Sequence, residues 1–449
     1  MKASKISALL LLAPVVFLTG CDTTLNVKSP ASSYFIKYFG NEGSQTGTDF
    51  IVNKDGTIVL FGTTQKGNED PRFYLVKADA KGNFMWERKF GTAKCQARDV
   101  ELASDGRIVV LGNIIAAGRT DYDIYLKTFS QDGQVIDSLP PGKPDYKNAI
   151  TGEHTNEDAM TVTQTNDGFI VAGSSGNIAH PSDPTVIKDP LFLRVDDNLA
   201  IYSKGTWPDV PAYGRATENI STKIVQLPDL SFYVFGYTKY KEDSSPQTDF
   251  DFWYFKMSPT GDPAKGENFI PSPGKDQKLF SVTADTTSLG NGFFLAGLET
   301  DVTGAGIYIT RLVHPPLGFI AADALPIEPK SLNFALGPLS TVLNPQNPSN
   351  EFVSACLSKG SGYLILTNQV TSGNSNLLLT KVGNTDRDVG WTTAVIFGGL
   401  GDDFAGSVQE LPDGKIVIVG TMTVGQASLS NGETKMVMIK VNKNGQFSD

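Results

Sequence analysis

Few residues of this 449-residue chain have the types and spacing that indicate catalysis. The three histidines, His154, His180 and His314, lie far apart, and none belongs to a zinc motif such as H-E-x-x-H. Neither a G-x-S-x-G nucleophile motif nor a phosphate-binding glycine loop occurs in the sequence. The sequence therefore predicts no catalytic residue and no cofactor.

Acidic residues occur close together at places where they could supply oxygen ligands for Ca²⁺, or an acid and a base. These places are Glu69-Asp70, Asp196-Asp197, Asp402-Asp403, and the looser pair Asp249 and Asp251. No complete EF-hand loop surrounds any of them. Because acidic residues are mostly exposed, we interpret these groups as solvated turn residues and predict no metal site.

The N-terminal segment has the features of a secretion signal. Lys2 and Lys5 give it a basic start, and the apolar run from Ile6 to Leu18 is too short for a membrane span. The run ends at Leu18-Thr19-Gly20-Cys21, which resembles a bacterial lipobox. This resemblance implies that Cys21 becomes the first mature residue and carries acyl chains such as palmitate. Several chains on one residue would anchor a protein stably.

This interpretation divides the chain into three parts. Residues 1–20 are a lipoprotein signal peptide, residues 21–32 are the lipidated cysteine with a tether, and residues 33–449 are the folded part. The expected location is the bacterial cell envelope, at the outer membrane, with the lipid on Cys21 in the bilayer. The alternative is an ordinary secreted protein with a chance cysteine. A net charge of −10 without basic clusters argues against nucleic acid as a partner.

From residue 33 onward, short apolar runs recur between turns and loops, which is typical of strands. The first turn of each unit contains Asp55-Gly56, Asp105-Gly106, Asp167-Gly168, Pro228-Asp229, Asn291-Gly292, Ser361-Gly362 or Asp413-Gly414. The run after this turn ends on glycine in six units, and Thr367 takes that place in the sixth. The third run ends in a basic residue in every unit: Lys77, Lys127, Arg194, Lys256, Arg311, Lys381 and Lys440.

A fourth run is present in the earlier units but is missing after the seventh, because the chain stops at Asp449. A lone strand pattern at residues 33–40 supplies the missing run. The sequence thus predicts an all-β, seven-bladed β-propeller with four strands per blade, in which strand 33–40 completes the last blade. A large single sandwich is the competing fold, but it does not explain the missing last strand.

The repeat also resembles a known class of protein. Units such as W-T-T-A-V-I-F-G-G at 391–399 and D-G-K-I-V-I-V-G-T at 413–421 are similar to those of bacterial cell-envelope β-propeller repeat lipoproteins. The resemblance covers residues 33–449 and is best in units one, two and seven. Such proteins mostly lack a defined activity, so the resemblance implies the fold and leaves the chemistry open.

The loops suggest where a partner would bind. Connections between the second and third runs are long, whereas those between the first and second are tight turns. Variable loops on a rigid frame are where binding usually occurs. We therefore expect a membrane-anchored binding or scaffold protein that recognises an envelope protein or glycan on its long-loop face. The alternative is a carbohydrate-active or other envelope enzyme with acidic residues at the channel mouth.

Two further expectations concern single positions. The seven basic residues are interpreted as structural, with stems packed between blades and heads that reach solvent or turn carbonyls. Cys95 and Cys356 fall in units two and six, too far apart for a disulfide, and both are predicted to be free and buried.

Overall fold

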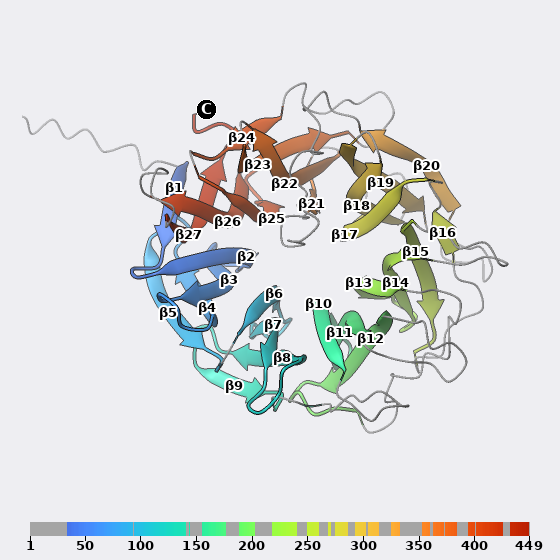
Figure 1. Cartoon of the computed structure of the whole chain (residues 1–449), viewed down its shortest axis with the longest axis horizontal. Helices are drawn as coiled ribbons and strands as arrows, with labels where there is room; N and C mark the ends of the chain where they lie inside the picture. The colour runs from blue at the N-terminus through green and yellow to red at the C-terminus, as the bar shows by residue number, and fades with distance from the viewer. Residues whose placement is uncertain are drawn as a thin grey trace, which may run out of the picture.

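The computed structural model describes residues 34–92, 94–140, 143, 155–176, 188–202, 218–239, 249–259, 268–270, 274–285, 292–301, 304–313, 325–332, 353–359, 362–371, 373–383, 394–399, 401–424 and 432–448. Within these ranges the regular structure is β-strand, in seven antiparallel sheets around a central axis (Figure 1). No helix in the described part of the chain is long and apolar enough to cross a membrane.

The sheets follow one another around the ring as blades, each with its first strand nearest the axis. Blades one to three consist of β2 (Ser44–Val52), β3 (Ile58–Gln65), β4 (Arg72–Ala78) and β5 (Phe84–Phe90); β6 (Gln96–Leu102), β7 (Ile108–Ile115), β8 (Tyr122–Phe129) and β9 (Val135–Ser138); and β10 (Asn156–Thr165), β11 (Gly168–Gly176) and β12 (Lys188–Asp196). In blade three, Ile201 bridges Val195 where the other blades have a fourth strand, and residues 203–217 lie outside the described residues.

The remaining four blades each have four strands. They are β13 (Asn219–Gln226), β14 (Phe232–Thr238), β15 (Asp251–Met257) and β16 (Asn268–Ile270); β17 (Asp276–Asp285), β18 (Gly292–Asp301), β19 (Gly304–Val313) and β20 (Leu325–Leu332); β21 (Val353–Leu357), β22 (Tyr363–Thr371), β23 (Asn374–Val382) and β24 (Val395–Phe397); and β25 (Phe404–Glu410), β26 (Ile416–Val424) and β27 (Glu433–Val441) with β1 (Phe35–Phe39).

The ring closes as the repeat count predicts. β1 forms the outer strand of blade seven and pairs antiparallel with β27, from Phe35 opposite Lys440 to Phe39 opposite Met436. The N-terminal strand therefore covers an edge that would otherwise be free to pair with another chain. The seven-bladed propeller and its closure by the N-terminal strand are confirmed.

The core lies between neighbouring blades. In β3 the run Ile58-Val59-Leu60-Phe61 is buried on both faces, because blade seven covers one side and blade two the other. This explains why the strands lack strict alternation of polar and apolar residues. Each fully buried side chain of this size contributes about 1.5–3 kcal/mol to stability.

A β-bulge interrupts the inner strand of six blades, and it explains the recurrent glycine. The bulges fall at Gly47/Asp49, Ala97/Asp99, Ala159/Thr161, Ser221/Lys223, Leu279/Ser281 and Ala405/Ser407. Beside the bulge, a carbonyl presses against the second strand: a Cβ on Gly236 would lie 1.9 Å from the Ile220 oxygen. β21 pairs with β22 without a register shift, and there Thr367 replaces glycine. Glycine is thus needed where the bulge crowds its neighbour.

Candidate functional site

The residue directly after the bulge has the same register position in each inner strand, and the inner strands are the ones nearest the ring axis (Figure 1). In each blade this residue pairs with the one that precedes the recurrent glycine, or Thr367 in blade six. We call these seven residues the axial ring; they are Asp49, Asp99, Thr161, Lys223, Ser281, Ser354 and Ser407.

Most of the axial ring shares a structural role, which is to join one blade to the next. The Val100 amide donates to Asp49 Oδ2 at 3.1 Å, and the Val162 amide donates to Asp99 Oδ2 at 2.8 Å. Hydroxyls make the same link elsewhere: the Ala355 amide donates to Ser281 Oγ at 3.0 Å and the Val408 amide to Ser354 Oγ at 3.3 Å. A serine hydroxyl is therefore enough to accept the amide proton of the next blade, and this hydrogen bond does not require the charge of a carboxylate.

Blades one to four turn the axial ring into a continuous hydrogen-bonded chain. Lys223 Nζ donates to Thr161 Oγ1 at 2.8 Å, and Thr161 Oγ1 donates to Asp99 Oδ2 at 2.7 Å. The Asp99 side chain is in turn hydrogen-bonded to Asp49, which also bonds Ser407. The chain thus connects an ammonium group, a hydroxyl and two carboxyl groups through hydrogen bonds that polarise one another.

The acidic end of this chain favours a protonated carboxyl group. Burial, the charge of Asp99 and a hydrogen bond to the Asp99 side chain hold the pKa of Asp49 well above its ordinary value. Hydrogen bonds from Ser407 and from the Val100 amide act in the opposite direction but are weaker. Two carboxyl groups in contact rarely both ionise, so the contact with Asp99 favours the protonated form of Asp49.

Glu101 is a second carboxyl group with altered acidity, two residues after Asp99 on the same face of β6. Burial raises the pKa of Glu101 to about 7; the nearby Lys223 ammonium lowers it, and the Asp99 charge raises it further. Asp49, Asp99 and Glu101 all remain half-buried, so water reaches them. A half-protonated acid next to a carboxylate is an arrangement suited to proton transfer.

Sequence reasoning missed these acids because they are not adjacent in sequence. Asp49 and Asp99 lie in T-D-F-I and R-D-V-E, and neither belongs to the acidic groups singled out above. The available signal was alignment of the repeats on their recurrent glycines, which places the two aspartates at the same position of neighbouring blades. In the folded ring, the residues at this equivalent position of neighbouring blades contact each other beside the bulge.

The acidic groups predicted from sequence have structural partners. Asp402 Oδ1 accepts from the Ser375 amide, and the buried Asp403 accepts from the Thr423 and Gly399 amides. Asp196 accepts from two amides in its own turn, and Asp249 Oδ2 accepts from the Gly274 amide. Glu69 and Asp70 are exposed. Asp403 and Asp251 are buried, so the prediction of solvated turn residues was wrong for these two.

A separate acidic cluster lies where blades two and three meet on the long-loop face. Asp121, Asp123 and Glu157 bring carboxylate oxygens within 4.8 Å of one another. Arg119 forms ion pairs with Asp121 and Asp123, and thus supplies a cation to the cluster. Burial raises the pKa of Glu157 to about 8, against hydrogen bonds from Thr155 and Ser175. The cluster therefore consists of Glu157, protonated at neutral pH, packed against the ion pairs that Arg119 forms with Asp121 and Asp123.

The recurrent basic residues are structural where their contacts are described. Lys77 Nζ donates to the Gln131 carbonyl at 3.1 Å, Arg194 to the Pro259 carbonyl at 3.2 Å, and Lys440 to the Ala80 carbonyl at 3.1 Å. Each acceptor lies in the turn between the third and fourth strands of the next blade. The predicted role of these stems and heads is confirmed at these three positions.

Cys95 and Cys356 are thiols on blades two and six, as expected. Cys95 is buried, but Cys356 is only half-buried, so the prediction of burial was wrong for it. The reason is that Cys356 lies on β21, an inner strand that faces the middle of the ring. Cys21 and the three histidines lie outside the described residues.

Comparison with known proteins agrees with this architecture. A family model described as a domain of unknown function (DUF5122) beta-propeller matches residues 411–447, and no curated protein matches the chain. Among solved structures, the α-L-arabinofuranosidase Arb93A of Fusarium graminearum is 11% identical, with 90% of this chain and 98% of that chain covered and a TM-score of 0.41.

Two other solved structures are similar to the same extent. A PL25 ulvan lyase is 10% identical, covers 92% of this chain and 98% of its own, and has a TM-score of 0.48. The intramolecular trans-sialidase of Ruminococcus gnavus is 12% identical, with 93% and 98% covered and a TM-score of 0.41. The likeness is weak and concerns the ring of sheets, so it transfers no activity to this chain.

Proposed function

We propose that this protein is a carbohydrate-active enzyme that uses the carboxyl groups near the ring axis as acid and base. The observation that carries the proposal is the excess of acid at one end of the axial ring. Serines make the link between blades five to seven, whereas blades one and two carry Asp49 and Asp99 beside Glu101. A carboxyl group kept away from bulk water beside a carboxylate costs folding free energy. Such a pair therefore indicates a function in addition to joining the blades.

Cleavage of a glycosidic bond is the reaction that two carboxyl groups can perform by themselves. In the proposed step Glu101 gives its proton to the departing sugar oxygen while the bond from that oxygen to the anomeric carbon breaks. The Asp99 carboxylate accepts a proton from water, and the water oxygen bonds to the anomeric carbon. Proton exchange with solvent then restores both groups.

The spacing of the two groups predicts the stereochemical result. The Cα atoms of residues two apart in a strand are separated by about 6.6 Å along it, and parallel side chains on one face would keep their carboxyl groups at a similar spacing. Enzymes that invert the anomeric carbon hold their carboxyl groups about 6.5–9.5 Å apart, because a water must fit between them. Proton NMR of the first product should therefore show the anomer opposite to that of the substrate.

The remaining chain members have supporting roles. The Asp49 carboxyl group, whose raised pKa favours its protonated form, is hydrogen-bonded to the Asp99 side chain and would hold it in place. Lys223 compensates the charge of Asp99 through Thr161. We further propose that the lipid on Cys21 holds the enzyme at the outer membrane of the bacterial envelope, where a polysaccharide would be its substrate.

The test is release of new reducing ends from a panel of neutral and acidic polysaccharides. The wild type should act on at least one of them, and the Glu101→Gln variant should lose that activity while it keeps its melting temperature. Equal activity of both proteins would show that any cleavage comes from elsewhere. Inactivity of a folded wild type across the panel would count against the proposal.

A binding protein without catalysis is the second candidate. It is favoured by the links between blades, since the Asp49 and Asp99 oxygens already serve a structural purpose. In that case the partner would be an envelope protein or a glycan, and the long-loop face predicted from sequence would be its site. Capture of one partner by the wild type and by Glu101→Gln alike, without turnover, would select this candidate.

A further inference from the structure

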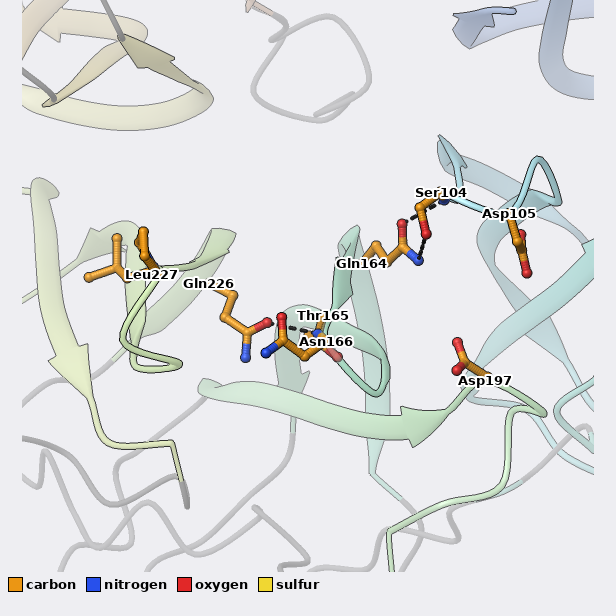
Figure 2. A pocket seen from close by; sticks show the side chains of 9 residues that line it. Ser104, Asp105, Gln164, Thr165, Asn166, Asp197, Gln226 and Leu227 are labelled. Atoms are coloured by element: carbon orange, nitrogen blue, oxygen red, sulfur yellow. Dashed lines mark hydrogen bonds between the residues drawn. The ribbon is translucent and has the colours of Figure 1, made fainter.

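The face opposite the long loops carries a cavity over blades two, three and four. Its volume is about 650 Å³, and the turns that end the inner strands form its wall (Figure 2). Ser104 comes from the turn after β6, Asn166 from the turn after β10, and Leu227 from the turn after β13. A volume of this size is typical of small-molecule sites.

Side-chain amides hold these turns in fixed positions. Gln164 Oε1 accepts from the Ser104 amide at 2.8 Å, and Gln164 Nε2 donates to Ser104 Oγ at 2.9 Å (Figure 2). Gln226 Oε1 accepts from the Asn166 amide at 2.9 Å. Each glutamine therefore joins its blade to the preceding one, and the wall of the cavity is preorganised.

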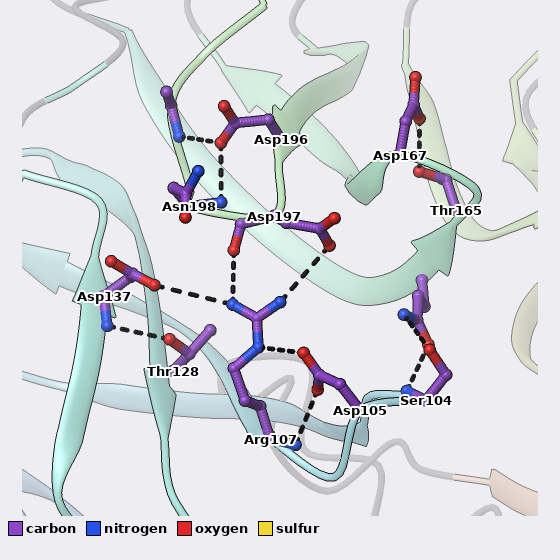
Figure 3. A network of polar contacts seen from close by, with 12 residues as sticks. Ser104, Asp105, Arg107, Thr128, Asp137, Thr165, Asp167, Asp196, Asp197 and Asn198 are labelled. Atoms are coloured by element: carbon purple, nitrogen blue, oxygen red, sulfur yellow. Dashed lines mark hydrogen bonds and ion pairs between the residues drawn. The ribbon is translucent and has the colours of Figure 1, made fainter.

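The arginine beside the cavity is engaged by carboxylates, which outnumber it. Arg107 lies among three carboxylates: its Nε is 2.6 Å from Asp105 Oδ2, NH2 is 3.4 Å from Asp197 Oδ1, and NH1 is 3.7 Å from Asp137 Oδ2 (Figure 3). None of the described residues that line the cavity is basic. An anionic ligand would therefore meet carboxylates and no available cation.

The remaining groups of the wall are hydroxyls, side-chain amides and a small apolar surface. The exposed Asn166 side chain makes no hydrogen bond within the described part of the chain, so its donor and acceptor can serve a ligand. Leu227 and Pro228 offer apolar contact beside it. Neutral sugar rings complement this wall, because their hydroxyls can hydrogen-bond to its polar groups and their weakly apolar faces can pack on its apolar surface.

The cavity also lies next to the proposed catalytic groups. Glu101 on β6 precedes Ser104, in the turn after β6, by three residues, and Lys223 precedes Gln226 by three on β13. Each is therefore at most about 10 Å from the cavity wall along the chain. We propose that this cavity is a subsite for neutral saccharide, through which a polysaccharide chain reaches the axial ring. This inference rests on the proposed function, and it places substrate entry on the face opposite the long loops.

The experiment separates binding from turnover by using Glu101→Gln as the parent protein. The probe is an array of neutral oligosaccharides (glucans, xylans, mannans and chitooligosaccharides) together with uronate-containing ones. Two substitutions act on the cavity: Asn166→Ala removes a hydrogen-bonding group, and Asn166→Trp fills space. The control is Lys54→Ala, because Lys54 precedes Asp55-Gly56 in blade one just as Asn166 precedes Asp167-Gly168.

We expect the parent to retain neutral saccharides, Asn166→Ala to weaken their binding about tenfold, and Asn166→Trp to abolish it. Lys54→Ala should bind as the parent does. Binding that is unaffected by both Asn166 variants, retention of uronates alone, or no retention at all would overturn the subsite. The reducing-end assay on the wild type still decides the proposed function separately, since it does not depend on Asn166.

Discussion

The axial ring consists of two arcs, a serine arc in blades five to seven and a charged arc in blades one to four. Both join neighbouring blades, but they do so with different chemical groups. Blades five to seven use Ser281, Ser354 and Ser407, whereas blades one to four use two aspartates, a threonine and a lysine. In both arcs an oxygen of one blade accepts an amide proton from the next. The serine arc shows what closure of the ring requires, and the charged arc shows what is present in addition.

The largest effect should come from Asp99→Asn, which removes the proposed base but keeps an oxygen for the Val162 amide. We expect glycosidic cleavage to fall on the order of a thousandfold with little loss of stability. Ser354→Ala in the serine arc should leave the rate unchanged and cost about 1 kcal/mol of unfolding free energy, because the Val408 amide loses its acceptor. Comparable rate losses in both variants would erase the distinction between the arcs.

The bulges give the next effect, on stability. Gly236→Ala places a Cβ 1.9 Å from the Ile220 carbonyl oxygen, so the bulged strand of blade four must shift. We expect a loss of about 3 kcal/mol or more in chemical denaturation. Blade six has no bulge in its inner strand, and Thr367→Ala there should cost less than half as much. Equal losses would contradict the link between bulge and glycine.

Acidity should appear as a pH-dependent difference in stability between wild type and Glu101→Gln. The pKa of Glu101 in the folded protein, about 7, lies above the ordinary value of 4.5 for a free glutamate. Its contribution is therefore fully present below pH 4.5 and is lost as pH rises through 7. The stability of Glu101→Gln relative to the wild type should rise by about 3 kcal/mol between pH 4.5 and pH 8.

Denaturation by urea at several pH values measures this difference. The exposed Glu69→Gln controls for the loss of one negative charge and should run parallel to the wild type at every pH. If the unfolding free energy of Glu101→Gln also ran parallel to that of the wild type at every pH, the pKa of Glu101 would not be raised. The charged arc would then have no group assigned as the general acid.

The smallest effect concerns the cavity face. Leu230 has φ of 65° at the place where Gly56 and Gly106 have φ of 81° and 88° in the equivalent turns. A leucine in this left-handed region is strained, and Leu230→Gly should stabilise the protein by about 0.5–1 kcal/mol in thermal denaturation. Destabilisation would show that the exposed Leu230 side chain makes contacts that outweigh its backbone strain.

The sequence alone predicted the ring of blades, but it did not predict the candidate site near the ring axis. Turn pairs, recurrent glycines and the missing last run predicted seven blades and the place of the N-terminal strand, because these features depend on local backbone rules. Some strand limits differ: residues 33–40 were expected to form a strand, whereas β1 covers Phe35–Phe39. Such ends depend on tertiary pairing rather than on local pattern.

The candidate site could not be predicted because its members are remote in sequence and unremarkable one by one. Asp49, Asp99 and Thr161 meet only through the bulge and the rotation from blade to blade. Acids adjacent in sequence, such as Asp402 and Asp403, bind backbone amides instead. The cavity on the tight-turn face was also unexpected, since long loops had pointed to the other face, where the long-loop binding site stays a prediction.

The most direct test of the central claim compares two leaving groups in the wild type and in Glu101→Gln. A natural oligosaccharide needs a proton on its departing oxygen, whereas a dinitrophenyl glycoside of the same sugar does not. If Glu101 is the general acid, its loss should abolish cleavage of the oligosaccharide, spare the dinitrophenyl glycoside, and remove the fall in wild-type rate above pH 7. Equal losses on both substrates, or an unchanged pH profile, would contradict the account.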